Sequence, residues 1–337
     1  LKELIPAINE SNFNRFLFFI YYRHPGDIIR EGHINFLIKK AVKEGLSAIK
    51  AIKLATINAA NALGFNNLGA LAPGYKADIV VFDNLENLSI EKVFKDGKKV
   101  AENGEFLIST NKNRDNDDNA ISNNKDYLKN KYHKIYNSVN IGEISEIDFE
   151  LPQGSKYRVM NLVDHQILTK KSTMKFNKTP VSNDDLRRKD LNKLAVVERH
   201  NKTGNVGLGL LGGLSLKRGA IATSVGHDSH NIIVAGLENK DMLKAVKAIE
   251  KMNGGIAIIE NGKIIDKLPL TIAGLMSEKS LVEVAEILNR MRNKAKNMGV
   301  KNESPFMTIS FMALPVIPRL KVTDKGLFSA EKFDFVP

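Results

Sequence analysis

The chain has 337 residues, of which 43% are hydrophobic, and its formal net charge at pH 7 is +12. That length and composition allow two domains, each with a core of its own. Cysteine is absent, which excludes disulfides, thiolate metal ligands, cysteine nucleophiles and the zinc deaminases that need a Pro-Cys-x-x-Cys signature.

The lysines are scattered and are not interleaved with aromatic residues in a basic stripe, so we expect no nucleic-acid partner. No apolar run reaches the length needed to cross a bilayer, and the start, which lacks a methionine, does not have the layout of a signal peptide. We therefore expect a cytoplasmic protein with no membrane partner.

Helical patterns surround one apolar run in the first 63 residues. Apolar side chains recur at helical spacing in residues 1–9, 34–44 and 48–63, whereas residues 16–20 are continuously apolar and predict a buried strand. A strand buried on both faces between helices is typical of a parallel sheet. Because one strand cannot form a sheet, we expect its neighbours to lie outside this chain or in another one.

Turn signals dominate the next segment. Gly64 can close the preceding helix, and the Pro73-Gly74 turn leads into a predicted strand at residues 79–83. The Asp96-Gly97 pair predicts a β-hairpin over residues 93–100. We interpret this segment as scaffold without chemistry.

An asparagine-rich tract separates the two halves of the chain. Residues 111–119 and 122–125 are almost entirely polar, a composition that cannot bury enough apolar area to fold alone. We predict a linker or exposed loop over residues 110–143.

Mixed strands and helices joined by short turns predict an α/β domain over residues 144–337. The glycines at 204, 207, 209, 212 and 213 lack the residues that a phosphate-binding loop requires, and we interpret them as a flexible loop beside the site. The predicted elements are strands at 157–162, 165–169, 194–198, 220–223 and 231–235, helices at 240–252 and 278–295, and a hairpin at 255–265 that turns at Asn261-Gly262.

Residues 224–231, Ser-Val-Gly-His-Asp-Ser-His-Asn, directly precede the apolar part of one predicted strand. They place His227, Asp228 and His230 within four residues at a strand edge, where a pocket can form. Imidazole and carboxylate groups ligate Zn, Mn or Fe and carry protons, so the cluster is a candidate site. The alternative is a polar turn in which Asp228 and Ser229 bond their own backbone.

Several motifs resemble known enzymes. Leu63-Gly64, Gly69 and Pro73-Gly74-x-Lys76-Ala77-Asp78 resemble the C-terminal end of the amidohydrolase superfamily. Within that superfamily, the chain resembles bacterial adenine deaminases along nearly its whole length. The residues that carry this resemblance are Arg23-His24-Pro25, Glu31-Gly32-His33-Ile34, Glu198-Arg199-His200, and the segments 216–220, 224–231, 268–276 and 320–327.

The resemblance implies an α/β fold in three parts. These are the tail end of an amidohydrolase (β/α) barrel over residues 1–62, part of its small β-sandwich over 63–109, and an adenine deaminase C-terminal α/β domain over 144–337. It also implies hydrolysis of adenine to hypoxanthine and ammonia by a metal-dependent enzyme that uses Mn or Fe, and it leaves room for a homodimer.

The resemblance also implies roles for individual residues. The catalytic candidates are His227, Asp228 and His230, presented to the barrel mouth by the C-terminal domain. The substrate-binding candidates are His24, Glu31, His33 and Arg199, with His200 a weaker one. The alternatives are capping and loop packing for the residues near the last barrel strand, and a solvated strand end for Arg199 and His200.

Two features depart from the family pattern. No His-x-His metal-binding pair stands near the start of the chain, and the position of the family's metal-binding aspartate is occupied by Tyr21 or Tyr22. A phenol, with an ordinary pKa of about 10, replaces a carboxylate poorly at neutral pH, so the metal ligands stay unassigned. We expect an impaired deaminase, and the alternative is a non-catalytic remnant or a purine-binding module.

Overall fold

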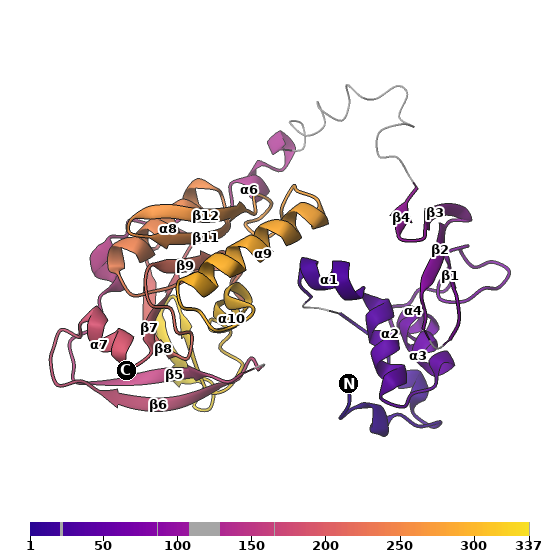
Figure 1. The fold of residues 1–337 in the computed structure, drawn as a ribbon, viewed down its shortest axis with the longest axis horizontal. Coiled ribbons are helices and arrows are strands. Elements are labelled where there is room, and N and C mark those ends of the chain that lie inside the picture. Colours follow the sequence, from indigo (N-terminus) through magenta and orange to yellow (C-terminus); the bar gives the residue numbers. More distant parts are fainter. Residues whose placement is uncertain (21–22, 86, 108–128, 165, 337) are drawn as a thin grey trace. The chain divides into compact units, whose positions relative to one another are not determined.

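The computed structural model describes residues 1–20, 23–85, 87–107, 129–164 and 166–336. The chain divides into two compact units, Leu1–Asn123 and Asn124–Pro337 (Figure 1). Tyr21, Tyr22 and the asparagine-rich tract lie outside the described residues. Within the described residues, no helix is both long enough and apolar enough to span a membrane.

Short helices form the first part of the first unit. Its buried core gathers around the fully buried Ala41, Ala51 and Leu54. Ser47 caps α3, because its hydroxyl accepts a hydrogen bond from the Lys50 amide at 3.4 Å. The helices are η1 (Ile5–Ala7), η2 (Phe13–Arg15), α1 (Pro25–Glu31), α2 (Ile34–Lys43), α3 (Ala48–Ala55) and α4 (Ile57–Ala62).

The strand predicted at residues 16–20 is wrong. This run forms no strand in the structure; Phe18 instead donates its amide to the Leu54 carbonyl at 3.0 Å and packs into the helical core. Of this run only Phe18 is buried, whereas Leu17 and Phe19 are 37% and 71% exposed, so the run does not have the two buried faces that the predicted strand requires. The helix predicted over residues 1–9 shrinks to η1, since Pro6 would break a helix that began at Leu1.

A four-stranded antiparallel sheet completes the first unit. Its strands are β1 (Ile79–Phe82), β2 (Ile90–Lys95), β3 (Lys98–Glu102) and β4 (Glu105–Phe106), in that order. The predicted hairpin is confirmed: Asp96 and Gly97 have φ values of 50° and 77°, the left-handed conformation that a two-residue hairpin turn requires. The Asp78 carboxylate supports the turn by accepting from the Asp96 amide at 2.9 Å.

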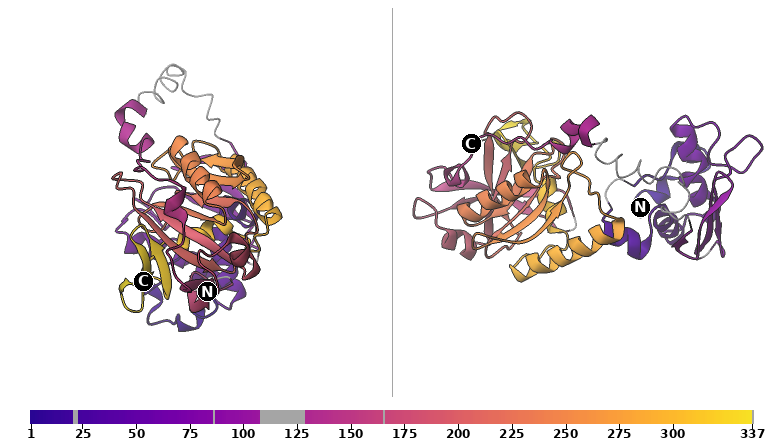
Figure 2. Two further views of the ribbon diagram at one scale, coloured as in Figure 1. Left: turned by 90° about the vertical axis from the view of Figure 1, so that its left-hand side faces the viewer. Right: turned by 90° about the horizontal axis from the view of Figure 1, so that it is seen from above.

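The second unit is an eight-stranded sheet covered by helices on both faces (Figures 1 and 2). The strand order is β12-β11-β9-β10-β7-β8-β5-β6, and all neighbours are antiparallel except β5 and β8. The strands are β5 (Lys156–Leu162), β6 (Thr169–Lys175), β7 (Leu191–Val197), β8 (Val206–Gly212), β9 (Ala220–Thr223), β10 (Ile232–Gly236), β11 (Gly255–Glu260) and β12 (Lys263–Pro269).

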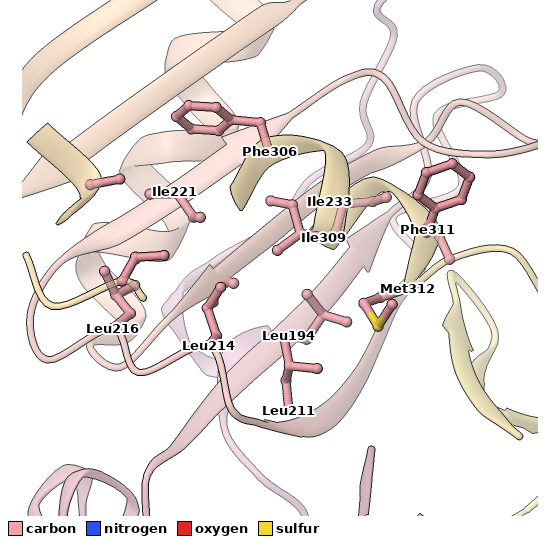
Figure 3. Packing of buried hydrophobic residues seen from close by; sticks show 14 of the residues in the cluster. Leu194, Leu211, Leu214, Leu216, Ile221, Ile233, Phe306, Ile309, Phe311 and Met312 are labelled. Carbon is pink, nitrogen blue, oxygen red and sulfur yellow. The ribbon is translucent and has the colours of Figure 1, made fainter. Parts of the chain in front are cut away.

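Each central strand supplies alternate residues to two cores. On β7, Leu194 and Val196 belong to the core under α9 (Leu281–Asn297) and α10 (Pro305–Phe311), whereas Ala195 and Val197 belong to the core under α8 (Asn239–Lys251). Figure 3 shows the first core, where side chains from β7, β8, β9 and β10 meet those of α10. This period of two is what a strand buried on both faces imposes.

Smaller elements surround the sheet. They are α6 (His133–Tyr136), η3 (Glu146–Phe149), α7 (Asn183–Arg188), and a three-stranded sheet of β13 (Leu320–Thr323), β14 (Gly326–Ser329) and β15 (Asp334–Phe335). Val139 and Ile141 are buried in the core under α8, so the packed part of this unit includes residues before 144.

The prediction of a flexible loop in the glycine-rich segment is wrong, because most of this segment forms strand β8. The β13–β14 hairpin crosses it so closely that a Cβ on Gly207 would lie 1.8 Å from the Thr323 carbonyl oxygen. A Cβ on Gly209 would lie 2.8 Å from a methyl carbon of Val322. These glycines therefore permit close packing, which is a regular use of glycine in strands.

Candidate functional site

The predicted cluster lies on the loop between β9 and β10, two central strands of the second unit. Ser224, fully buried, fixes the start of this loop: its hydroxyl donates to the Gly274 carbonyl at 2.6 Å and accepts from the Gly255 amide at 2.7 Å. At the other end, the His230 amide bonds to the Gly226 carbonyl. The loop is thus held at both ends by hydrogen bonds.

The structure brings two of the three predicted residues together. The rings of His227 and His230 have centroids 5.8 Å apart and lie at 68° to each other. His227 is 8% exposed, and its ring lies 4.9 Å from that of Phe311, a residue of α10. Asp228 is exposed to solvent, so the carboxylate does not share the buried position of the imidazoles.

Removal from solvent favours the neutral form of both imidazoles. It lowers the pKa of His227, with the charge of Asp228 opposing the shift. Burial also lowers the pKa of His230, assisted by the neighbouring His227 and Arg199 and opposed by Asp228. A neutral imidazole has one nitrogen that donates and one that accepts a hydrogen bond, so this pair is equipped to pass a proton.

Arg199, which follows β7, fixes the loop through hydrogen bonds to backbone carbonyl groups. Its side chain is fully buried, and its Nε donates to the His230 carbonyl. Its two Nη atoms donate to the Ser138 carbonyl at 3.1 Å and to the Ala273 carbonyl at 3.0 Å. Burial lowers the pKa of Arg199 to about 10, which leaves it charged at pH 7. Arg199 is therefore not a solvated strand end, and most of its donors are engaged within the protein.

The neighbours of Arg199 complete this framework. The Glu198 carboxylate accepts the amides of Asn201 and Thr203 at 2.9 and 3.1 Å; burial would raise the pKa of Glu198, but these amide donors lower it below its ordinary value. His200 is exposed, and its Nε2 donates to the Ser229 carbonyl at 2.7 Å. The Glu198-Arg199-His200 motif thus fixes the histidine loop, residues 224–231 between β9 and β10.

The candidates of the first unit lie at the ends of α1 and at the start of α2. The Arg23 guanidinium forms an ion pair with Glu31, donates to the Asp27 carbonyl at 3.2 Å and lies 3.9 Å from the centre of the Phe36 ring. His24 precedes α1 and His33 precedes α2, and neither side chain caps its helix. Glu31 thus anchors Arg23, which is the packing role weighed as its alternative.

The described residues do not fit a resident metal ion. Among them, no group of three or more His, Cys, Asp or Glu side chains is arranged to hold one. Tyr21 and Tyr22, at the position of the family aspartate, lie outside the described residues.

Several supporting residues carried no recognisable sequence signal. Ser138 lies in the segment predicted to be a linker, and Phe311 and Ala273 lie 81 and 43 residues beyond His230 in the sequence. Sequence reasoning detects polar clusters within a short segment, whereas these contacts depend on the tertiary fold. The adjacency of Glu198, Arg199 and His200 was the one available signal for the framework.

Comparisons with known proteins agree with this architecture. The amidohydrolase family matches residues 3–100, and the adenine deaminase C-terminal domain matches residues 166–334. These matches place the chain among proteins of amidohydrolase descent. More particularly, the chain belongs to the adenine deaminase family.

Curated relatives match the entire chain. It is 49% identical to the adenine deaminase of Petrotoga mobilis, 42% identical to adenine deaminase 2 of Carboxydothermus hydrogenoformans and 40% identical to the adenine deaminase of Clostridium acetobutylicum. Each alignment covers 100% of this chain but only 56%, 56% and 57% of the respective relative. The chain therefore spans a little over half the length of the curated relatives it matches.

Proposed function

We propose that this chain is the C-terminal portion of an adenine deaminase, and that it contributes to the hydrolysis of adenine to hypoxanthine and ammonia. The relatives named adenine deaminase match it from end to end. The observation that carries the proposal is the pairing of the buried His227 with the half-buried His230 on a loop that Arg199 fixes. We assign residues 1–62 to the end of the barrel, 63–109 to the sandwich, the polar tract that follows to a linker, and residues 144–337, together with the packed residues just before 144, to the C-terminal domain.

Proton transfer is the step that these residues are suited to perform. Deamination requires a proton for the departing ammonia, and a neutral imidazole accepts and donates protons near pH 7. The Arg199 bond to the His230 carbonyl and the Phe311 ring beside His227 hold the two rings. The charge of Asp228, exposed beside them, opposes the lowering of the pKa of both imidazoles, and Asp228 is our candidate for returning the proton. Arg199, our candidate for substrate binding, contributes by positioning this loop.

The remaining assignments rest on the family. Amidohydrolases generally bind a divalent metal, for which we propose Mn or Fe. The described residues supply no matching set of ligands. We therefore assign no step of the reaction to a metal held by this chain. His24, Glu31 and His33 are proposed to line the purine pocket. We also propose a cytoplasmic enzyme that is able to form a homodimer.

Two assays test the proposal. First, the chain alone should release ammonia from adenine no faster than a buffer blank, even with excess Mn, because no three-ligand group is present among its described residues. Turnover well above the blank would contradict the assignment of an impaired portion. Adenine binding without turnover would instead support the purine-binding alternative.

Second, the positions equivalent to His227 and His230 should be changed to glutamine in the Petrotoga mobilis relative. Loss of a proton-transfer group reduces turnover by roughly 10²- to 10⁴-fold. A change at the position equivalent to His133, which lies on α6, serves as the matched histidine control and should leave turnover nearly unchanged. Full turnover in both test variants would contradict the proposal and would support the alternative, in which the loop is a polar turn without a catalytic role.

A further inference from the structure

A cavity in the second unit contains a buried amine. It has a volume of about 430 Å³, and its lining includes Lys193 of β7, Glu150 and Glu238. Lys193 pairs in register with Gly236, at the end of β10 farthest from His230. Lys193 and Arg199 are six positions apart along β7 and its extended continuation, a span of roughly 20 Å. The cavity is therefore distinct from the histidine loop.

Lys193 has the character of a nucleophile. It is only 5% exposed, and its Nζ donates to the Asn239 side-chain oxygen at the start of α8. Burial lowers the pKa of Lys193 to about 8, with the charges of Glu238 and Glu150 opposing the shift. A substantial fraction of this amine is neutral near pH 7.5, which is how buried lysines become reactive toward carbonyl groups.

Glu238 offers a proton acceptor at the same cavity. Its Oε1 accepts from an Arg187 Nη at 3.2 Å. Its Oε2 is buried and has no hydrogen-bond partner within the described parts of the chain. One oxygen of the carboxylate is thus held in place and the other is available for proton transfer beside the amine.

The charges of the lining select the type of ligand. Besides Lys193, the charged residues that line the cavity are Glu146, Glu150, Glu238 and Lys240. Three carboxylates face two lysine side chains, so the lining keeps an excess of negative charge, and an anionic ligand would be repelled unless it carried its own counter-charge. A small, uncharged carbonyl compound meets no such penalty.

We propose that Lys193 is a covalent binding site for small uncharged aldehydes. The amine nitrogen attacks the aldehyde carbon, and a C–N bond forms as the carbonyl π bond opens. The two amine protons pass to the former carbonyl oxygen, which leaves as water when the C=N bond of the imine forms. Glu238 Oε2 accepts and returns a proton during these transfers. No oxidant or reductant is required.

Lys321 is the internal comparison. Burial lowers its pKa to about 8 as well, but it does not line this cavity, and its Nζ donates to the Ile167 carbonyl at 2.8 Å. Reactivity that depended on burial alone would mark both lysines. Reactivity that depends on the cavity marks Lys193 only.

The test is reductive trapping with glycolaldehyde and cyanoborohydride at pH 7.5, followed by peptide mass mapping. Lys193 should be modified at least about tenfold faster than Lys321 and than the exposed Lys244 of α8. Glyoxylate, an anionic aldehyde, should modify Lys193 at least about tenfold more slowly than glycolaldehyde does. Equal modification of Lys193 and Lys321, or equal rates with the two aldehydes, would overturn the proposal.

Two variants separate a reactive amine from a structural one. Lys193→Arg keeps the cation and should abolish the adduct at this position. Glu238→Gln removes the charge that raises the pKa of Lys193, so the midpoint of trapping against pH should move downward while the maximal rate falls. An unchanged pH profile and rate in Glu238→Gln would show that the carboxylate takes no part in the reaction.

Discussion

Arg199 is the residue on which the geometry of the histidine loop depends most. Its guanidinium joins the carbonyls of His230, Ala273 and Ser138, three segments that are distant in the sequence. A Cβ on Gly274 would lie 2.6 Å from one Nη atom, so the arginine packs against a backbone position that has no room for a side chain. A planar group with a fixed fork of donors can serve three carbonyls at once, and an ammonium cannot.

We predict that Arg199→Met destabilises the second unit by about 3 kcal/mol, because buried carbonyls lose their donors at roughly 1–3 kcal/mol each. The free energy of unfolding in urea measures this. Arg188→Met is the control, since that side chain is 74% exposed and its loss should change stability by no more than about 0.5 kcal/mol. A similar small change for both variants would contradict the role given to Arg199.

His227 and His230 predict how stability depends on pH. Their pKa values are lowered in the folded state, so the unfolded chain binds more protons below its ordinary histidine pKa of about 6.5. Stability should be fully present above that pH and should fall as the pH drops through 6.5 toward the folded values. Urea midpoints at pH 7.5 and 5.5 measure the effect, and His230→Gln should reduce it. A midpoint that rises on acidification would have the wrong sign.

At the scale of elements, local turn chemistry was predictable and tertiary packing was not. Asp96-Gly97 and Asn261-Gly262 specify their hairpins through backbone conformation, and both turns form. Strand β8 was missed because its glycines are explained by contact with Thr323 and Val322, more than 100 residues away. Likewise, the histidine cluster was visible in the sequence, whereas the burial of Arg199 and its three carbonyl partners was not.

The close crossing at β8 predicts a specific sensitivity. Gly207→Ala would place a Cβ 1.8 Å from the Thr323 carbonyl oxygen, so the β13–β14 hairpin must shift, at a cost of roughly 1–3 kcal/mol. Gly154→Ala is the matched control, because the nearest atom to a Cβ there is 3.8 Å away. Thermal unfolding of both variants measures the difference. Equal stability would mean that the hairpin does not pack on β8 in solution.

At the scale of the whole molecule, the two units differ in how completely they bury their apolar residues. The second unit closes two cores around its central sheet. The first buries a small helical core and leaves Phe19, Leu63 and Phe106 exposed by 71%, 69% and 66%. Exposed apolar side chains of this size favour association. The first unit should therefore be the less stable of the two.

Limited trypsin digestion tests this difference. The polar tract at residues 111–125 contains Lys112, Arg114 and Lys125, and its composition predicts early cleavage there. A fragment that begins near residue 126 should resist further cutting, because it retains both cores of the second unit, whereas the N-terminal fragment should be degraded. Hydrogen exchange supplies the matching measurement, since amides of α2 and α3 should exchange faster than those of β7 and β10. Uniform protection of both units in a monomer would show that the first unit is as stable as the second despite its exposed apolar surface.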